Sequence, residues 1–358
     1  MAGRRRSARQ KQNREQSTFD YSLLLITLCL VGFGLLMIYS ASSYTSQVKY
    51  NDSTYFLKKQ AIGVAAGLVA MFIVCKIPYK YYAARLPLLR MRMITLVYMV
   101  AVVMQVLVLF ISSEVNGAKR WLSIGGLSIQ PSEFTKIAVI LVAAYFIQME
   151  DMGKIQGIVR VFAPCSLLIL LVAVENLSTA IVIFTIVFCM CIVASKKKSL
   201  YWVLGGAGLA MMALYVKFGD SFRSGRFEIW RNVETNEKGY QILQGLYAIA
   251  SGGMFGSGLG ESMQKLGFIP ESHNDMIFAI ICEELGMVGA AIVIIMFIFM
   301  LWRILNTAMN APDLFTGMIC TGVMIHIASQ VVMNVAVVTN SMPSTGIPLP
   351  FISYGGTS

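Results

Sequence analysis

The chain has 358 residues, of which 57% are hydrophobic and only 13% are charged, and its mean hydropathy is +0.69. Because a soluble domain has about 25% charged residues, this composition excludes a soluble globular protein and predicts a polytopic membrane protein. No Walker loop and no dinucleotide-binding glycine motif occurs, so we expect no use of nucleotides. The seven cysteines lie in or beside apolar segments and form no CxxC pair, which is typical of small buried side chains.

The net charge of +11 is distributed in a way that argues against nucleic-acid binding. Basic residues crowd the polar segment 1–19 and recur between apolar segments, at 76–92 and 196–198. Cytoplasmic loops of membrane proteins carry positive charge in this pattern. Residues 1–19 also lack the apolar core and cleavage site of a signal peptide. We therefore predict a basic cytoplasmic tail over 1–19 and a single transmembrane domain over 20–358.

The apolar segments predict the membrane topology, since a helix needs about 20 apolar residues to cross the bilayer. With the N-terminus in the cytoplasm, the basic loops lie inside. The loop 112–131, the long polar segment 217–272 and the segment after 338 then lie outside. We expect a tenth helix beyond the final Ser-Tyr-Gly-Gly-Thr-Ser. In chain order the nine predicted helices are 21–48, 60–75, 93–113, 131–149, 160–174, 177–195, 199–216, 275–302 and 314–338.

The first outside segment with unusual residues is NGAKRWLSIGGLSIQPSEFTK, residues 116–136. Lys119 and Arg120 lie in this outside loop, although basic residues usually favour the cytoplasmic side. They are either an interfacial anchor beside a tryptophan or a site for phosphate oxygens, which Arg and Lys bind well. Glu133 and Lys136 follow in the next helix at a spacing of three residues, which allows an ion pair on one face. Such a pair within the membrane indicates a functional or site-shaping role.

The second segment, 217–272, ends at a cluster of polar residues where the next helix begins. Residues 240–250 are apolar enough to lie along the membrane surface. Asp275 is either the cap of the helix that follows, a role that Asp fills well, or a catalytic group. Glu283 and Glu284 lie two turns deeper and are expected to face the interior of the helix bundle rather than lipid.

The third segment, NSMPSTGIPLPFISYGGTS, covers residues 340–358 and contains three prolines and three glycines without any charge. Non-helical backbone at membrane depth is tolerated only where it contacts protein or lines a water-filled cavity. We therefore predict a re-entrant or cavity-lining segment here.

A carboxylate, several cations and a cavity on the outer face suit the transfer of a sugar from a lipid-linked pyrophosphate. The pyrophosphate is already a good leaving group, so no acid is needed to protonate it. The acceptor hydroxyl does need a base, which one carboxylate can supply. Attack from the opposite face inverts the anomeric centre, and the second carboxylate of a glycosidase is not required.

These segments resemble the SEDS family (shape, elongation, division and sporulation), and the resemblance covers residues 20–358. The motif GLGESMQK followed by FIPESH is more similar to FtsW-like and SpoVE-like members than to RodA-like members. The other motifs that carry the resemblance are YSASS, KRWLSIGGLSIQPSEFTK, GYQILQGLYAIASGG, HNDMIFAIICEELG and GIPLPFISYGGTS.

The resemblance implies an all-α fold of ten transmembrane helices in the bacterial cytoplasmic membrane. It implies polymerisation of lipid II into a nascent glycan strand at the outer face of that membrane. The implied partners are a class B penicillin-binding protein, which is a transpeptidase, and other divisome proteins at the septum. The essential acid of the family's His-Thr-Asp motif falls on Asp275, and the residues that shape the central cavity fall on Glu133 and Lys136. Two departures are Asn274 in place of Thr, and Asn176 where the family's helix turn has an Asp.

Further polar residues of these motifs are candidates for binding substrate or shaping the cavity. Two histidines are too few for a metal centre built on His. If Mg²⁺ or Mn²⁺ is required, Asp275 is the candidate ligand. The additional candidates are Lys119, Arg120, Gln130, Ser132, Gln264, Lys265, Glu271, His273 and Asn334.

Two other functions remain open from the sequence. A flippase for the lipid-linked precursor would also place polar residues inside a helical bundle, although the richest polar loop lies on one side only. A non-catalytic divisome scaffold would not need Asp275, Glu133 or Lys136. The sequence also leaves open whether the chain serves division, elongation or sporulation.

Overall fold

The computed structural model describes residues 19–78, 81, 92–112, 122–124, 127–206, 228–236 and 239–355. Within these residues, eight helices are long and apolar enough to cross a membrane, which confirms the polytopic helical class. The ninth predicted helix, 199–216, is helical as far as it is described, to residue 206. The eight are α2 (Tyr21–Tyr50), α3 (Tyr55–Lys76), α5 (Met93–Ile111), α6 (Pro131–Met149), α7 (Ile155–Glu175), α8 (Leu177–Ala194), α12 (Ile277–Met309) and α13 (Leu314–Val338).

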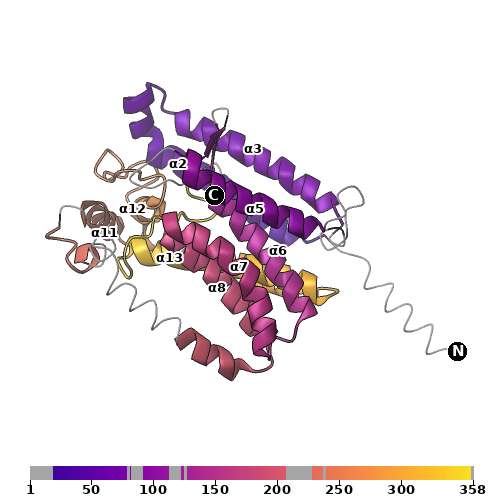
Figure 1. Cartoon of the computed structure of the whole chain (residues 1–358). Helices are drawn as coiled ribbons and strands as arrows, with labels where there is room; N and C mark the ends of the chain where they lie inside the picture. Colours follow the sequence, from indigo (N-terminus) through magenta and orange to yellow (C-terminus); the bar gives the residue numbers. More distant parts are fainter. Residues whose placement is uncertain are drawn as a thin grey trace, which may run out of the picture.

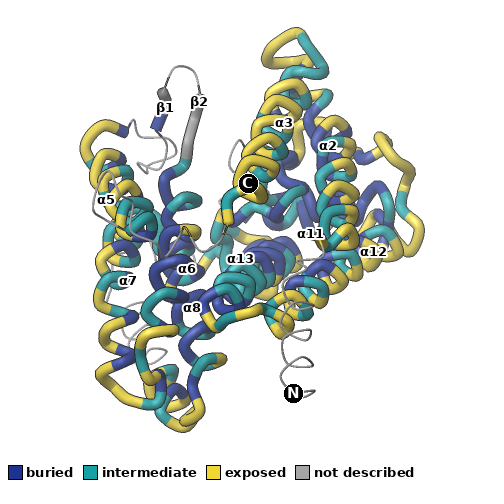
Figure 2. The backbone as a smooth tube through the Cα atoms, turned by 90° about the vertical axis from the view of Figure 1, so that its right-hand side faces the viewer, coloured by how far each residue is buried: buried dark blue, intermediate teal, exposed yellow. Residues whose placement is uncertain are grey.

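The helices form two groups that α13 joins. One apolar core gathers α5, α6, α7 and α8, and a second core gathers α2 and α12. Helix α13 contributes to both cores and packs against α6, α8 and α12, and it lies between the two groups in Figure 2. Helix α3 packs on α2 and leaves most of its apolar residues exposed, as a lipid-facing helix does.

The segment before α12 contains the short helix α11 (Tyr240–Gly252), which lies beside α12 (Figure 1). Small residues on α11 face α12, because Gly245 approaches Met276 and Gly252 approaches the backbone at Cys282. The sequence predicted an apolar segment here, and its buried face is the one that packs on α12.

Helix α12 is interrupted at Gly286, where φ is +66° and the backbone is not helical. Glycine adopts this conformation without the steric cost that a side chain brings. The segment after α11 lies against the interruption, so the exposed peptide groups find partners inside the protein. Four hydrogen bonds of 2.9–3.1 Å make this connection: Ser257 N–H to Glu283 O, Gly258 N–H to Glu284 O, Met287 N–H to Gly253 O, and Val288 N–H to Met254 O.

One element differs from the all-helical prediction. Strands β1 (Leu122–Ile124) and β2 (Leu127–Ile129) pair as an antiparallel hairpin within the predicted 112–131 loop. The sequence LSIGGLSI has apolar residues alternating with serine on both sides of two glycines, which is a hairpin pattern. Hydropathy over a window as long as a membrane span does not reveal the hairpin, because each strand has only three residues.

We predict that Gly252→Ala destabilises the protein, because the new Cβ would collide with the carbonyl oxygen of Cys282. Overpacking of this kind costs about 1–3 kcal/mol, and the midpoint of thermal unfolding in detergent should fall. Gly32→Ala in α2 is the matched control, because no atom lies within 4 Å of the Cβ it would add. Equal midpoints for the two variants would contradict the close packing of α11 on α12.

Candidate active site

Asp275 lies just before α12 but does not cap it. The helix begins at Ile277 with Met276 as its N-cap residue, and no side chain caps the first turn. The cap interpretation of Asp275 is therefore wrong, because Met276 holds the N-cap position and stands between Asp275 and the helix. Its half-buried carboxylate instead accepts a hydrogen bond of 3.3 Å from the Nε2 of Gln241, in the first turn of α11.

Burial is the main influence on the acid–base properties around Asp275. It raises the pKa of the Asp275 carboxyl to about 6 from its ordinary 3.8, because the charged form is poorly solvated there. Burial also lowers the pKa of His273 to about 4, so this imidazole is neutral at pH 7. The centroids of the His273 and Phe56 rings lie 4.3 Å apart. Glu271 is exposed and accepts a hydrogen bond of 2.8 Å from Asn274 Nδ2.

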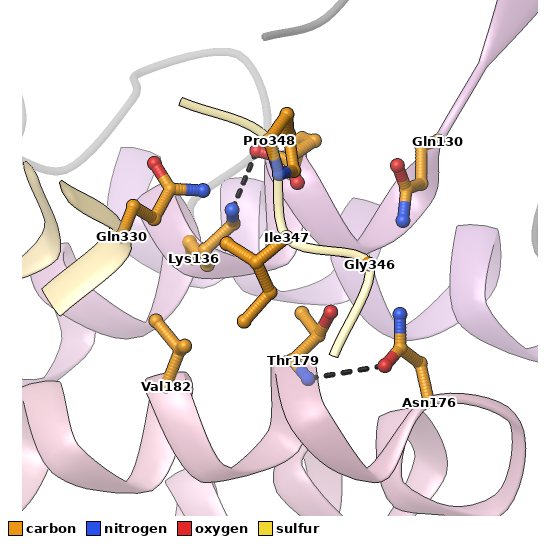
Figure 3. Close-up of a pocket in the computed structure, with 10 residues that line it drawn as sticks. Gln130, Lys136, Asn176, Thr179, Val182, Gln330, Gly346, Ile347 and Pro348 are labelled. Carbon is orange, nitrogen blue, oxygen red and sulfur yellow. Dashed lines mark hydrogen bonds and ion pairs between the residues drawn. The ribbon is translucent and has the colours of Figure 1, made fainter. Parts of the chain in front are cut away.

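A polar pocket lies between α6, α8 and the segment that follows α13 (Figure 3). Lys136 Nζ lies 2.6 Å from Glu133 Oε2, and its side chain is only 2% exposed, so the predicted ion pair is present. Pro131 in the first turn of α6 positions both side chains at the helix start. The residues that line the pocket are Gln130, Glu133, Lys136, Asn176, Thr179, Val182, Gln330, Gly346, Ile347 and Pro348.

The segment after α13 lines this pocket through Gly346, Ile347 and Pro348, which confirms its predicted role as a cavity wall. Figure 3 shows it passing between Gln330 on one side and Gln130 on the other. The turn between α7 and α8 also contributes through Asn176 and Thr179. The sequence marks this turn only as a departure from the family pattern.

Helix α13 connects the pocket with Asp275. Gln330 lines the pocket, and Asn334 lies one helical turn further along the same face. The Nδ2 of Asn334 donates to the carbonyl oxygens of Asp275, at 2.8 Å, and of Ile347, at 2.9 Å. Asn334 was a predicted site residue, and the structure places it between the two parts of the site.

Glu283 and Glu284 are both buried, as predicted, and each has partners in the segment between α11 and α12. Glu283 accepts hydrogen bonds from the Ser262 hydroxyl and from the backbone N–H of Met263, the latter at 2.9 Å. Glu284 pairs with Lys265 Nζ at 2.8 Å and accepts a hydrogen bond of 2.6 Å from the Ser40 hydroxyl in α2. The two glutamates therefore attach this segment to α12 and α2.

The remaining predicted residues are distributed as follows. Ser132 is buried at the start of α6. The backbone N–H of Gln264 donates a hydrogen bond of 3.4 Å to the Glu283 carboxylate. Lys265 and Gln264 do not line the pocket. Lys119 and Arg120 lie outside the residues that the structure describes. Gln241, Gln330 and Thr179 are not among the predicted site residues, because spacing along the chain does not show which uncharged polar side chains of a helix face a pocket.

No cluster suited to a metal ion is present in the described part of the chain, where a group of at least three His, Cys, Asp or Glu side chains was sought. Asp275 has one amide partner and a neutral histidine nearby, so a metal there would have to take its other ligands from substrate or water. The dependence on Mg²⁺ or Mn²⁺ stays a prediction.

These features define a polytopic helical membrane protein with a polar pocket and a half-buried carboxylate just before α12. Residues 21–358 match the family model of the FtsW, RodA and SpoVE cell cycle proteins. Stage V sporulation protein E of Bacillus subtilis is 36% identical, over 95% of this chain and 92% of its own length. The probable peptidoglycan glycosyltransferase FtsW of Trichlorobacter lovleyi is also 36% identical, over 95% of this chain and 89% of its own length.

Two solved structures share the fold. A chain of a peptidoglycan synthase complex that coordinates polymerization and crosslinking has a TM-score of 0.77 at 22% identity, covering 95% of this chain and 93% of its own. The rod shape determining protein RodA of Thermus thermophilus has a TM-score of 0.68 at 22% identity, and the match covers 96% of this chain and 92% of that one. The chain belongs to the FtsW, RodA and SpoVE family, which is the SEDS family that its motifs resemble.

We predict that Lys265→Met strongly destabilises the protein, because it leaves the Glu284 carboxylate buried without its cation. Breaking a buried pair in this way costs about 3–5 kcal/mol, which a lower midpoint of thermal unfolding would report. Lys58→Met is the matched control, since the Lys58–Asp52 pair is also 2.8 Å long but exposed to solvent. Similar midpoints for both variants would show that the Lys265–Glu284 pair does not attach the segment between α11 and α12 to α12.

Proposed function

We propose that this chain is a peptidoglycan glycosyltransferase that polymerises lipid II into glycan strands at the outer face of the cytoplasmic membrane, with Asp275 as the general base. The observation that supports it best is a half-buried carboxylate of raised pKa, tied through Asn334 to a pocket that contains a buried lysine. A general base works best when its pKa lies close to the working pH.

The reaction follows from these groups. The Asp275 carboxylate takes the proton from the acceptor sugar hydroxyl as its oxygen attacks the anomeric carbon of the donor. The bond from that carbon to the pyrophosphate oxygen breaks, and the pyrophosphate leaves with the electron pair. Lys136 is paired with Glu133, and the further N–H donors of its ammonium group suit a phosphate oxygen in the pocket. One carboxylate is sufficient because the leaving group needs no proton, and the product has inverted configuration.

The flippase and scaffold alternatives are weaker. Among the described residues, the most deeply buried ion pairs, Glu133–Lys136 and Glu284–Lys265, use residues near the N-terminal ends of α6 and α12 rather than midway along the spans. One-sided chemistry uses such a site, whereas alternating access needs a site near the middle of the bilayer. A scaffold has no use for a carboxylate with a raised pKa.

The cellular setting is part of the proposal. Residues 20–358 form one transmembrane domain, with the basic tail 1–19 in the cytoplasm and the segment 217–272 outside. The partner is a class B penicillin-binding protein that crosslinks the strands, and one solved relative belongs to a complex that combines polymerization and crosslinking. Identities of 36% to a sporulation protein and to an FtsW are compatible with either setting, and we favour the division septum.

We expect Asp275→Asn to abolish polymerisation of purified lipid II by the full-length protein with its penicillin-binding partner, whose own active site is blocked. The amide cannot accept the proton, and loss of a general base typically costs about 10²–10⁴-fold in rate. Glu261→Gln is the control, because Glu261 is an exposed carboxylate of the same polar segment that has no assigned role in the site. Full activity of Asp275→Asn would move the search for the base to Glu133, and an inactive parent would favour the flippase or scaffold.

We expect the rate of polymerisation to rise with pH and to reach half its plateau near pH 6, since only the deprotonated carboxylate acts as a base. The pKa of Asp275 is raised on folding, so the folded state favours the protonated acid and Asp275 destabilises the protein above about pH 4. Asp275→Asn should therefore be at least as stable as the parent at pH 7. A rate that is constant between pH 5 and 8 would argue against Asp275 as the base.

A further inference from the structure

We propose that Ser353 and Asn334 are positioning residues for the catalytic base, and that together with the Tyr354 backbone they clamp the loop that carries Asp275. The inference rests on the proposed function, because it assigns these residues a role through Asp275. It extends that function to a segment at the far end of the chain, in which Ser353 had no assigned role.

Three consecutive carbonyl groups carry the inference. The carbonyl oxygen of His273 accepts from Tyr354 N–H at 2.9 Å, that of Asn274 from the Ser353 hydroxyl at 2.7 Å, and that of Asp275 from Asn334 Nδ2 at 2.8 Å. Residues 271–276 form turns rather than a helix or strand, so no regular ladder fixes their backbone. The clamp supplies the partners that secondary structure would otherwise provide.

The clamp is itself rigid. Ser353 is 0% exposed and Asn334 is 1% exposed, so water does not compete for their hydrogen bonds. The Ser353 oxygen also accepts the N–H of Leu349 at 2.8 Å, which closes the tight turn that contains both residues. Gly34 in α2 lies against the same turn, at Phe351 and Ile352, and leaves no room for a side chain. The loop cannot shift without breaking buried hydrogen bonds.

The clamp also fixes the distance between the base and the pocket. Asn334 donates to Asp275 and to Ile347 with the same amide nitrogen, and Ile347 lines the pocket beside Lys136. A base must lie within hydrogen-bond reach of the proton it takes, and a displacement of about 1 Å can cost 10²-fold in rate. We therefore assign the clamp a role in catalysis in addition to its contribution to stability.

The experiment compares Ser353→Ala with the parent in polymerisation of purified lipid II by the full-length protein and its partner. Thr321→Val is the matched control, because Thr321 is also buried and its hydroxyl bonds only to Gly317 in its own helix. Ser353→Thr keeps the hydroxyl and tests rescue. If Ser353→Ala does not fold, Asn334→Leu takes its place, since it removes the other side-chain donor at nearly constant volume.

We expect Ser353→Ala to lower kcat about tenfold or more while KM stays within twofold, with a midpoint of thermal unfolding close to that of Thr321→Val. Ser353→Thr should recover most of the lost kcat. Unchanged kcat in Ser353→Ala would overturn the proposal. A loss of kcat that only follows a lower unfolding midpoint, or that Ser353→Thr does not repair, would overturn it as well.

The result is distinguishable from a failure of the proposed function. If Asp275→Asn is inactive and Ser353→Ala is fully active, the base is correct and the clamp is not needed for catalysis. If Asp275→Asn is fully active, Asp275 is not the base, and a loss of kcat in Ser353→Ala then has to act through another group. In that case both the assignment of Asp275 as the base and the catalytic role of the clamp are wrong.

Discussion

A peptide group or a charge that this chain takes into an apolar environment needs a partner inside the protein, and the arrangement around the start of α12 follows from this requirement. Lipid offers no hydrogen bonds, and an unpaired peptide group there costs several kcal/mol. Helix α12 is interrupted at Gly286, and the segment after α11 supplies the missing partners. Glu283 and Glu284, which would be costly next to lipid, are paired by the same segment.

The same requirement produces the candidate site. The loop before α12 and the segment after α13 are both non-helical, and each satisfies the peptide groups of the other. Asp275 is held in this contact, with its carboxylate exposed enough to meet substrate and buried enough to have a pKa near 6. The other side of the segment lines the pocket that holds Lys136 and Glu133. Stability and a defined position of Asp275 thus arise from one set of hydrogen bonds.

Much of this could be read from the sequence, because it depends on composition and local spacing. Eight predicted spans are present, with boundaries that differ by up to seven residues where helices extend beyond their apolar core. The Glu133–Lys136 pair follows from a spacing of three residues on a helix. The hairpin β1–β2 was missed because its strands are short, and the capping role of Asp275 was wrong because the helix begins two residues later.

The sequence by itself determined the class of protein, its family and the carboxylate on which the proposed chemistry depends, since residue type and short-range periodicity carry that information. Only the tertiary structure decided which polar groups meet. Ser40 bonds to Glu284, 244 positions away, and Asn334 joins Asp275 to Ile347. Such partners depend on how α2, α12 and α13 pack, and neither hydropathy nor spacing along the chain encodes the distance between residues on different helices.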